Sequence, residues 1–418
     1  MAIAVVGLDL AKHVFQVHAV DETGRAVLRR QLRRAGVEAF FKILPPCIVG
    51  IEACASAHYW ARRITALGHE VRLIAPAKVK PYVQRGKKND ANDAAAIVEA
   101  VMRPHMVFVP IKNEEQQAVL MLHRTRDLLV RQRTMLVNAI RAHLAEFGIV
   151  AAQGRRKVKE LIAGLDNTEM PELARIALWQ IADQIDECDK RIDALERRIL
   201  AWHKSDESSC NLATIPGIGP ITASAMAATV PSPSAFRNGR QLAAWLGLVP
   251  RQNSSGGKDR LSGITKTGNT YIRRLLVIGA TSVIRFARSK APGTAEWLKK
   301  LLERKSARLA SVALANKMAR IAWSVLTRGE VYRDIHPVPK PTCEVAPVWW
   351  TPTMLLREVS LWPRRILPMR RSSGARWLSW SARDGRRRTC RASSNRQPRQ
   401  SGTGCAKRIA MRGAVRSA

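Results

Sequence analysis

Apolar and polar residues alternate along the first quarter of the chain in a way that predicts a mixed α/β sheet. Three strands are expected at 4–10, 13–21 and 25–32, with a D-E-T-G turn before the third. Helices are expected at 36–44, 57–68, 76–83 and 92–102, with strands at 47–53 and 70–76. A three-stranded meander followed by alternating helices and strands is the element order of an RNase H-like domain, which we place at 1–112.

Strand patterns disappear between 113 and 207, where two long helical patterns flank a looser stretch around 148–171. The second helical pattern places isoleucines and a leucine at helical spacing among i,i+4 charge pairs. This pattern predicts a coiled-coil or helical-hairpin arm, and a helix packed inside one domain is the alternative.

A compact helical region is expected at 208–333. It opens with Pro216, Gly217, Gly219 and Pro220, which form a tight turn before a helix. Such a turn resembles half of a helix-hairpin-helix element, whose amides can hold a backbone phosphate. Gly217 and Gly219 are therefore candidate nucleic-acid contacts, and a simple turn between helices is the alternative.

The final segment, 334–418, has a different composition: 18 Lys and Arg against 4 Asp and Glu, five of the eleven tryptophans, and many Pro and Ser without periodicity. This composition predicts disorder. The segment is either a disordered tail that binds nucleic acid or sequence read from a shifted or extended frame.

The charge of the chain points to a polyanionic partner. Its 418 residues carry 70 Lys and Arg against 33 Asp and Glu, a formal net charge of +37. Nucleic acid is the leading candidate because Lys and Arg neutralise backbone phosphates. A membrane partner is not expected, since no run of 18 uncharged apolar residues occurs. The N-terminus lacks a secretory signal pattern, so we expect a cytoplasmic protein, and its seven scattered cysteines predict reduced thiols without a zinc finger.

Four acidic residues sit where this sheet would bring them together. Asp9 ends the first strand, Glu52 ends the fourth, and Asp90 and Asp93 share one face of the helix after Lys87 and Lys88. At about 4 Å and an effective dielectric near 20, each pair of carboxylates repels by roughly 4 kcal/mol, so such a group requires a cation. The alternative is that Asp90 caps a helix, Asp93 faces water, and Asp9 and Glu52 end their strands by chance. Oxygen ligands suit Mg²⁺ or Mn²⁺. Lys87 and Lys88 would then contact phosphates, or they are solvated loop charges.

Several motifs resemble one known family. GLDLAKHVFQVH, GIEACASAHYW, KKNDANDAAAI, PGIGPITA and LAAWLGLVPRQNSSGGKDRLSGITKTGNTYIRRLL are similar to the DEDD transposases of the insertion-sequence one-ten type, eleven-eleven subgroup, over about 1–330. The resemblance implies a RuvC-like domain with Asp9, Glu52, Asp90 and Asp93 as the metal-binding tetrad. It also implies a coiled-coil linker, a C-terminal transposase domain with a nucleophilic serine, and guidance by a structured bridge RNA that pairs with donor and target DNA.

A polar, glycine-rich stretch at 253–270 carries the serine candidates. Family spacing implies Ser255 as the nucleophile, with Ser254 as the adjacent rival and Ser262 as a weaker one. A serine that attacks a phosphodiester needs an exposed backbone and nearby cations. The cations expected to meet the nucleic acid are Arg251, Lys258, Lys266, Arg273 and Arg274.

These features predict a DNA transposase or recombinase that cuts and rejoins DNA through a phosphoserine link. The resemblance further suggests that the metal site of one subunit meets the serine of another in a homodimer or homotetramer. A metal-dependent nuclease or junction resolvase without a covalent intermediate is the alternative, and an architectural nucleic-acid-binding protein is a third possibility.

Overall fold

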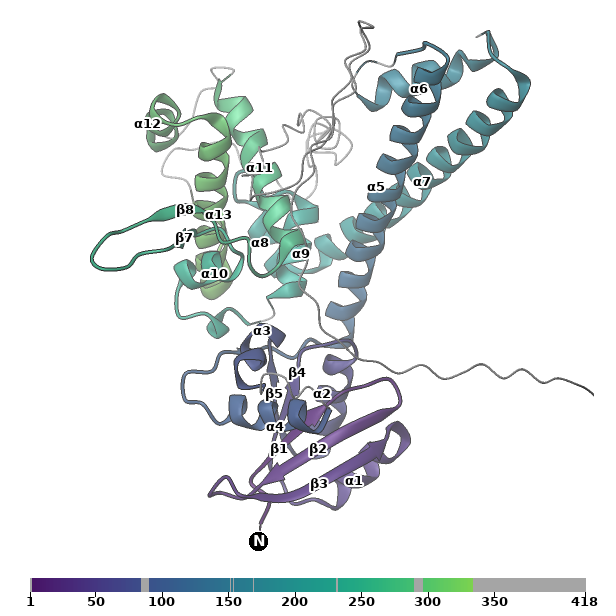
Figure 1. Cartoon of the computed structure of the whole chain (residues 1–418). Coiled ribbons are helices and arrows are strands. Elements are labelled where there is room, and N and C mark those ends of the chain that lie inside the picture. Colours follow the sequence, from purple (N-terminus) through teal and green to yellow (C-terminus); the bar gives the residue numbers. More distant parts are fainter. Residues whose placement is uncertain are drawn as a thin grey trace, which may run out of the picture. The chain divides into compact units, whose positions relative to one another are not determined.

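The computed structural model describes residues 2–83, 90–150, 152, 154–167, 169–230, 232–288 and 296–333 (Figure 1). The expectations for Lys87, Lys88 and the segment 334–418 lie outside the described residues. Within the described part, no helix combines the length and apolar character that crossing a bilayer requires.

A six-stranded mixed sheet forms the N-terminal part, so the predicted α/β class is confirmed. The strands are β1 (Val5–Asp9), β2 (Val14–Val20), β3 (Ala26–Arg33), β4 (Ile48–Glu52), β5 (Glu70–Ile74) and β6 (Phe108–Val109). Their order is β3-β2-β1-β4-β5-β6, with β1, β4 and β5 parallel and the other pairings antiparallel. The sequence did not predict β6, because two residues are too few to show a period.

Helices cover both faces of this sheet. They are α1 (Val37–Ile43), α2 (Ala57–Thr65), α3 (Pro76–Val79) and α4 (Asp90–Val101), with short 3-10 turns at Arg34–Gly36 and Lys80–Tyr82. Val6 and Leu8 of β1 share a core with α1 and α2, whereas Val5 shares a core with α4. This division follows from strand geometry, because successive side chains point to opposite faces.

Two glycines allow α4 to lie directly on the sheet. Gly7 of β1 pairs in register with Gly50 of β4. A Cβ atom at Gly7 would lie 2.3 Å from the carbonyl oxygen of Ala94, and one at Gly50 would lie 2.2 Å from a methyl of Val101. Glycine within a strand often marks such a close approach. The seating of α4 therefore depends on the absence of two side chains.

The middle of the chain forms two long helices, α5 (Glu114–Glu146) and α7 (Glu172–Ser205), which run side by side (Figure 1). α6 (Arg155–Ala163) and a 3-10 turn at Leu165–Asn167 lie between them in the chain. Asn113 begins α5 through a capping box with Gln116. Two ion pairs join the two long helices: Arg126 with Glu196 at 2.6 Å, which is buried, and Arg133 with Asp189 at 2.5 Å, which is partly buried.

The remaining described residues are mostly helical, as expected. The helices are α8 (Glu207–Ala213), α9 (Pro220–Thr229), α10 (Gly239–Trp245), α11 (Thr270–Arg288), α12 (Glu296–Arg304) and α13 (Ala307–Arg328), with a 3-10 turn at Pro233–Ala235. α9 is buried on all sides, in one core with α10, α11 and α13. β7 (Pro250–Gln252) and β8 (Leu261–Ile264) form an antiparallel hairpin in this region, for which the sequence predicted no strand.

The glycine contact under α4 can be tested by Gly7→Ala. The added methyl collides with backbone, so α4 must shift, and we expect the free energy of unfolding to fall by about 1 to 3 kcal/mol. Urea denaturation measures this loss. Gly36→Ala is the matched control, because a Cβ atom there meets nothing within 4 Å. Equal stabilities of the two variants would contradict the proposed role of Gly7.

Candidate active site

Three carboxylates converge at the end of β1. Side-chain oxygens of Asp9, Asp90 and Asp93 all lie within 4.8 Å of one another. Asp9 is the last residue of β1, and the two others occupy the first turn of α4. Asp90, Asp93 and Ile97 lie at helical spacing on one face, so the face that packs on the sheet also carries the acids. Three oxygen donors in this space suit a hard divalent cation such as Mg²⁺ or Mn²⁺.

Glu52 lies beside this group without belonging to it. Leu8 pairs with Ile51 in the parallel register, so Asp9 and Glu52 follow at the same level of adjacent strands. Each lies two residues beyond one of the paired glycines and therefore points to the face that carries α4. The structure thus brings three of the four predicted acids together and places the fourth close enough to act on Asp9 electrostatically.

The electrostatics of Asp9 show the cost of this arrangement. Burial, followed in order of effect by the charges of Asp93, Asp90 and Glu52, raises the pKa of Asp9 from 3.8 to about 6. Desolvation and like charges both disfavour the carboxylate form. A divalent cation would reverse the effect of the neighbouring acids, because each then ligates the same positive charge.

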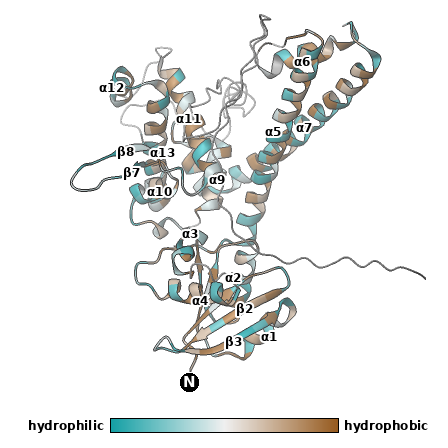
Figure 2. Ribbon diagram, in the orientation of Figure 1, coloured by the Kyte–Doolittle hydropathy of each residue, from teal (hydrophilic) through white to brown (hydrophobic). Residues whose placement is uncertain are grey.

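The serine candidates lie on the β7–β8 hairpin, which Figure 2 shows as hydrophilic. Every residue from Arg251 to Gly263 is exposed. The carbonyl of Ser255 accepts a hydrogen bond from the amide of Lys258 at 3.1 Å, which closes the tip of the hairpin. Between them Gly256 and Gly257 have φ values of 56° and 73°. A two-residue turn with both central φ values positive favours glycine and fits the twist of a hairpin.

Hydrogen bonding separates the three serines. The hydroxyl of Ser254 accepts from the Gln252 side chain at 3.3 Å and from the Arg260 amide at 3.2 Å. The hydroxyl of Ser262 donates to the carbonyl of Arg251 at 3.4 Å. Among the described residues, Ser255 forms a hydrogen bond only through its backbone, with Lys258. Its exposed hydroxyl is therefore the most accessible of the three.

Three of the predicted cations remain available to a nucleic acid. Arg251, Lys258 and Lys266 are exposed on or beside the hairpin. Lys266 has a φ of 57°, a left-handed conformation that is unfavourable for a residue with a side chain. Sequence reasoning missed Arg260, an exposed cation whose amide binds Ser254. Its position in the sequence, between the candidate cation Lys258 and the candidate serine Ser262, could have identified it.

The side chains of Arg273 and Arg274 both have partners within the protein, and their contacts with nucleic acid stay predictions. Arg273 is 8% exposed and donates to the carbonyls of Leu246 at 2.9 Å and Thr267 at 2.5 Å. Its guanidinium thus fastens the two chain segments at the base of the hairpin. Arg274 pairs with Asp127 of α5 and lies over the Tyr271 ring at 5.4 Å from its centroid. Arg273 is thus buried at the base of the hairpin, whereas the Arg274 side chain is 42% exposed.

The glycine turn before α9 also differs from its expected form. Gly217 is buried with a φ of 90°, and a Cβ atom there would lie 2.8 Å from the Met318 methyl. The amides of Thr222 and Ala223 donate to the carbonyl of Gly219, each at 2.9 Å, and Pro220 has no amide hydrogen. Gly217 therefore has a packing role, and few amides remain for an anion. A phosphate contact at Gly219 stays a prediction.

Comparison with known proteins gives consistent matches along the chain. The family model for the DEDD transposases of IS110 matches residues 6–149, and the model described as "Transposase IS116/IS110/IS902 family" matches residues 209–294. A "Probable family 20 transposase" of Pseudomonas aeruginosa is 50% identical over 337 residues, covering 80% of this chain and 99% of the relative. The transposase for insertion sequence element IS1111A of Coxiella burnetii is 40% identical, covering 79% and 92%.

The raised pKa of Asp9 predicts how the stability of the metal-free protein depends on pH. The folded state holds this proton up to about pH 6, whereas the unfolded chain releases it near 3.8. The native state therefore binds more protons between these values, and the free energy of unfolding falls as pH rises through this window. We expect Asp9 to contribute a loss of about 1 to 2 kcal/mol after allowance for its partial exposure. Urea denaturation in EDTA should show this slope, and Asp9→Asn should flatten it.

The same group of acids predicts stabilisation by divalent metal. Adding Mn²⁺ or Mg²⁺ at pH 7.5 should raise the melting temperature, because a ligand bound only to the folded state adds to its stability. At pH 5, protonation of Asp9 should reduce the rise. Asp93→Asn should remove most of it, whereas Asp186→Asn, at an exposed position on α7, should not. An identical response of the two variants would exclude metal binding at this group.

Proposed function

The chain belongs to the IS110/IS116/IS902 family of DEDD transposases, and from this premise we propose that it cuts and rejoins DNA through a serine–phosphate intermediate beside a divalent-metal site. As a transposase, it is an enzyme that acts on DNA, and its DEDD family implies a requirement for divalent metal. The serine step, the metal ligands and the guide are the proposed parts.

Asp9, Asp90 and Asp93 would hold the metal ion, with Glu52 as the fourth acid. The grouping of three carboxylate oxygens within 4.8 Å supports this assignment. So does the sheet, in which a meander and two parallel strands place acids at adjacent strand ends, as the proposed RuvC-like fold requires. A bound Mg²⁺ or Mn²⁺ would supply positive charge to the phosphate oxygens during strand cleavage.

Ser255 would act as the nucleophile. Its oxygen forms a bond to phosphorus, the bond from phosphorus to a sugar oxygen breaks, and that oxygen leaves as a hydroxyl after taking a proton. A hydroxyl of the second DNA strand then attacks the same phosphorus and releases the serine with its proton restored. Because one phosphodiester is exchanged for another, the rejoining needs no external energy source. The accessible hydroxyl of Ser255 at the hairpin tip is the observation that carries this assignment.

The surroundings of the hairpin support the proposed chemistry. Arg251, Lys258 and Arg260 are exposed cations on the same hairpin, and they can offset charge that develops on the phosphate. Arg273 anchors the base of the hairpin through two backbone carbonyls. A fixed base with a two-glycine tip allows the serine to adjust its position while the cations remain near it.

A structured bridge RNA as guide, and assembly as a homodimer or homotetramer, complete the proposal. The net charge of +37 exceeds what contact with a short DNA segment requires and supports a second polyanion. RNA that co-purifies with the protein, survives washing in high salt and maps next to its own gene would support guidance.

The serine assignment predicts the fate of a protein–DNA adduct. Wild-type protein incubated with its RNA, paired DNA sites and Mg²⁺ should form a covalent adduct that resists denaturation and disappears with protease. Ser255→Ala should abolish the adduct and recombination, because no oxygen remains to attack phosphorus. Ser254→Ala is the matched control and should retain both. Denaturing gels of labelled DNA measure the adduct.

The outcomes separate the two classes of enzyme. Metal-dependent cleavage that survives loss of both Ser254 and Ser255 would instead indicate a nuclease or junction resolvase. An adduct formed by Ser255→Ala would overturn the nucleophile assignment.

A further inference from the structure

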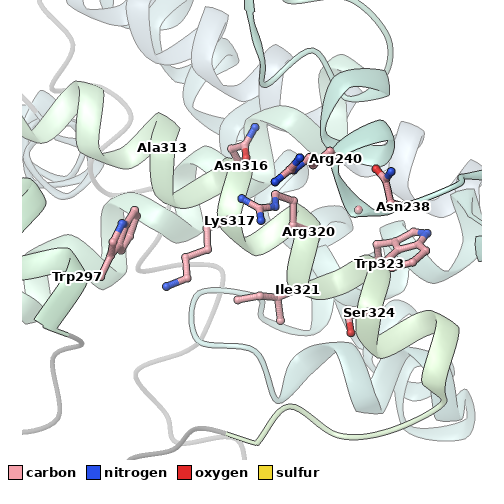
Figure 3. A pocket seen from close by; sticks show the side chains of 11 residues that line it. Asn238, Arg240, Trp297, Ala313, Asn316, Lys317, Arg320, Ile321, Trp323 and Ser324 are labelled. Carbon is pink, nitrogen blue, oxygen red and sulfur yellow. The ribbon is translucent and has the colours of Figure 1, made fainter.

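A cavity of about 620 Å³ lies between α10, α12 and α13, on elements distinct from the metal group and the hairpin (Figure 3). We propose that this cavity binds an unpaired nucleotide, with the base stacked on Trp297 and the backbone phosphate held by Arg240, Lys317 and Arg320. The inference rests on the proposed function in one respect, namely that the chain works on nucleic acid. It adds a site for single strands that the cleavage chemistry does not use.

The charge of the cavity indicates an anionic ligand. The described residues that line it include Arg240, Lys317 and Arg320 and no carboxylate. Among the ion pairs found in the described residues, none includes these three cations. Three cations around one hollow repel each other without an anion, and this repulsion would be relieved by a phosphate.

The packing of the two helices brings the arginines together. Gly239, which begins α10, is buried, and a Cβ atom there would lie 2.9 Å from the carbonyl oxygen of Arg320. This contact places Arg240 of α10 next to Arg320 of α13, and Figure 3 shows both side chains beside Asn316. Two guanidinium groups in this arrangement can bind the oxygens of one phosphate from two sides.

Trp297 supplies an aromatic surface at the other end of the cavity. Its side chain is 40% exposed, although the next residue, Leu298, is 3% exposed and anchors α12 in the core. The Lys317 ammonium lies 4.4 Å from the centroid of the Trp297 ring and occupies one face. An exposed indole on an anchored helix is a suitable platform for a nucleobase, and the adjacent ammonium strengthens the site for a phosphate.

The remaining lining makes the cavity rigid and polar. Trp323 donates through its indole N–H to the carbonyls of Pro233 and Phe236, each at 3.2 Å. Asn316 donates to the carbonyl of Leu248 at 3.2 Å, two residues before β7 begins. The cavity wall is therefore tied to the segment that leads into the serine hairpin. Its volume lies within the range of about 300 to 1,000 Å³ of small-ligand sites, and one nucleotide fits it.

The geometry selects an unpaired nucleotide over a duplex. In a duplex both faces of a base are stacked on its neighbours, so an indole can stack only on a base that has left the helix or belongs to a single strand. Single-stranded DNA and the loops of a guide RNA both present such bases. The shared chemistry is a phosphate next to a free base, and the experiment distinguishes the two sources.

The test measures the binding of ten-nucleotide probes, oligo(dT) and oligo(rU), to the full chain by fluorescence anisotropy, with a duplex of equal length alongside. Trp297→Ala should weaken the binding of single strands about tenfold, Trp297→Phe should weaken it less, and neither should change duplex binding. Removing one base to give abasic probes should weaken wild-type binding but not binding to Trp297→Ala. The probe, DNA or RNA, whose abasic form binds more weakly to the wild type but not to Trp297→Ala identifies the source of the nucleotide.

Charge variants test the phosphate contact. Arg320→Gln and Lys317→Gln should each lower the slope of log affinity against log salt by about 0.7 for single strands. Arg328→Gln, on the same helix, and Lys299→Gln, on α12, lie outside the cavity and are the matched controls. Arg240→Gln is a third variant. Arg240 is exposed and lies on α10, so the result for this variant does not depend on how Lys317 packs on α13.

The outcomes keep this inference separate from the proposed function. If cavity variants and controls bind single strands equally, or if Trp297→Ala weakens duplex binding as much, the cavity is not a nucleotide site. Adduct formation at Ser255 would still support the transposase mechanism in that case. If wild-type protein binds no probe of any kind, the premise that the chain works on nucleic acid fails as well.

Discussion

The contact of α4 with the Gly7–Gly50 pair is the constraint on which the candidate metal site depends. Side chains at these two strand positions would hold the helix away from the sheet, since Cβ atoms there meet Ala94 and Val101 at 2.3 and 2.2 Å. Because strands alternate, the same face presents Asp9 and Glu52 two residues later. The helix that covers the glycines thus delivers its own first-turn acids to the point where the strand acids emerge.

In this arrangement the acids repel one another at the point where the proposed metal ion would bind. Without metal, partial burial and the three neighbouring acids raise the pKa of Asp9 to about 6, so the folded protein carries an electrostatic cost. The apolar packing of Ile97 and Val101 on the strands offsets that cost and keeps the acids together. Perturbed carboxylates held by an apolar core are typical of catalytic and metal sites.

The C-terminal helices follow a different principle, in which buried polar contacts connect distant segments. His123 of α5 is hydrogen bonded to Tyr271 and to Ser224, each at 3.1 Å, and burial lowers its pKa to about 3, so it is neutral. Tyr271 lies in the first turn of α11, the helix that carries Arg273, which anchors the hairpin. α5 is therefore hydrogen bonded to the helix whose Arg273 anchors the base of the serine hairpin. The cavity at Trp297 is tied to the same base through Asn316 and Leu248.

The sequence by itself determined the sheet, the helical C-terminal region and the positions of the candidate acids, because periodicity and strand ends are local properties of the chain. Spacing alone placed Asp90 and Asp93 on one helical face. The tertiary structure alone decided the partners of the predicted cations: Arg273 is buried against two backbone carbonyls and Arg274 pairs with Asp127, whereas Arg251 lies on the exposed hairpin. It also decided that Gly217 packs against neighbouring helices and that Arg240, Lys317 and Trp297 line one cavity. These outcomes depend on contacts between residues far apart in the chain, which no local pattern records.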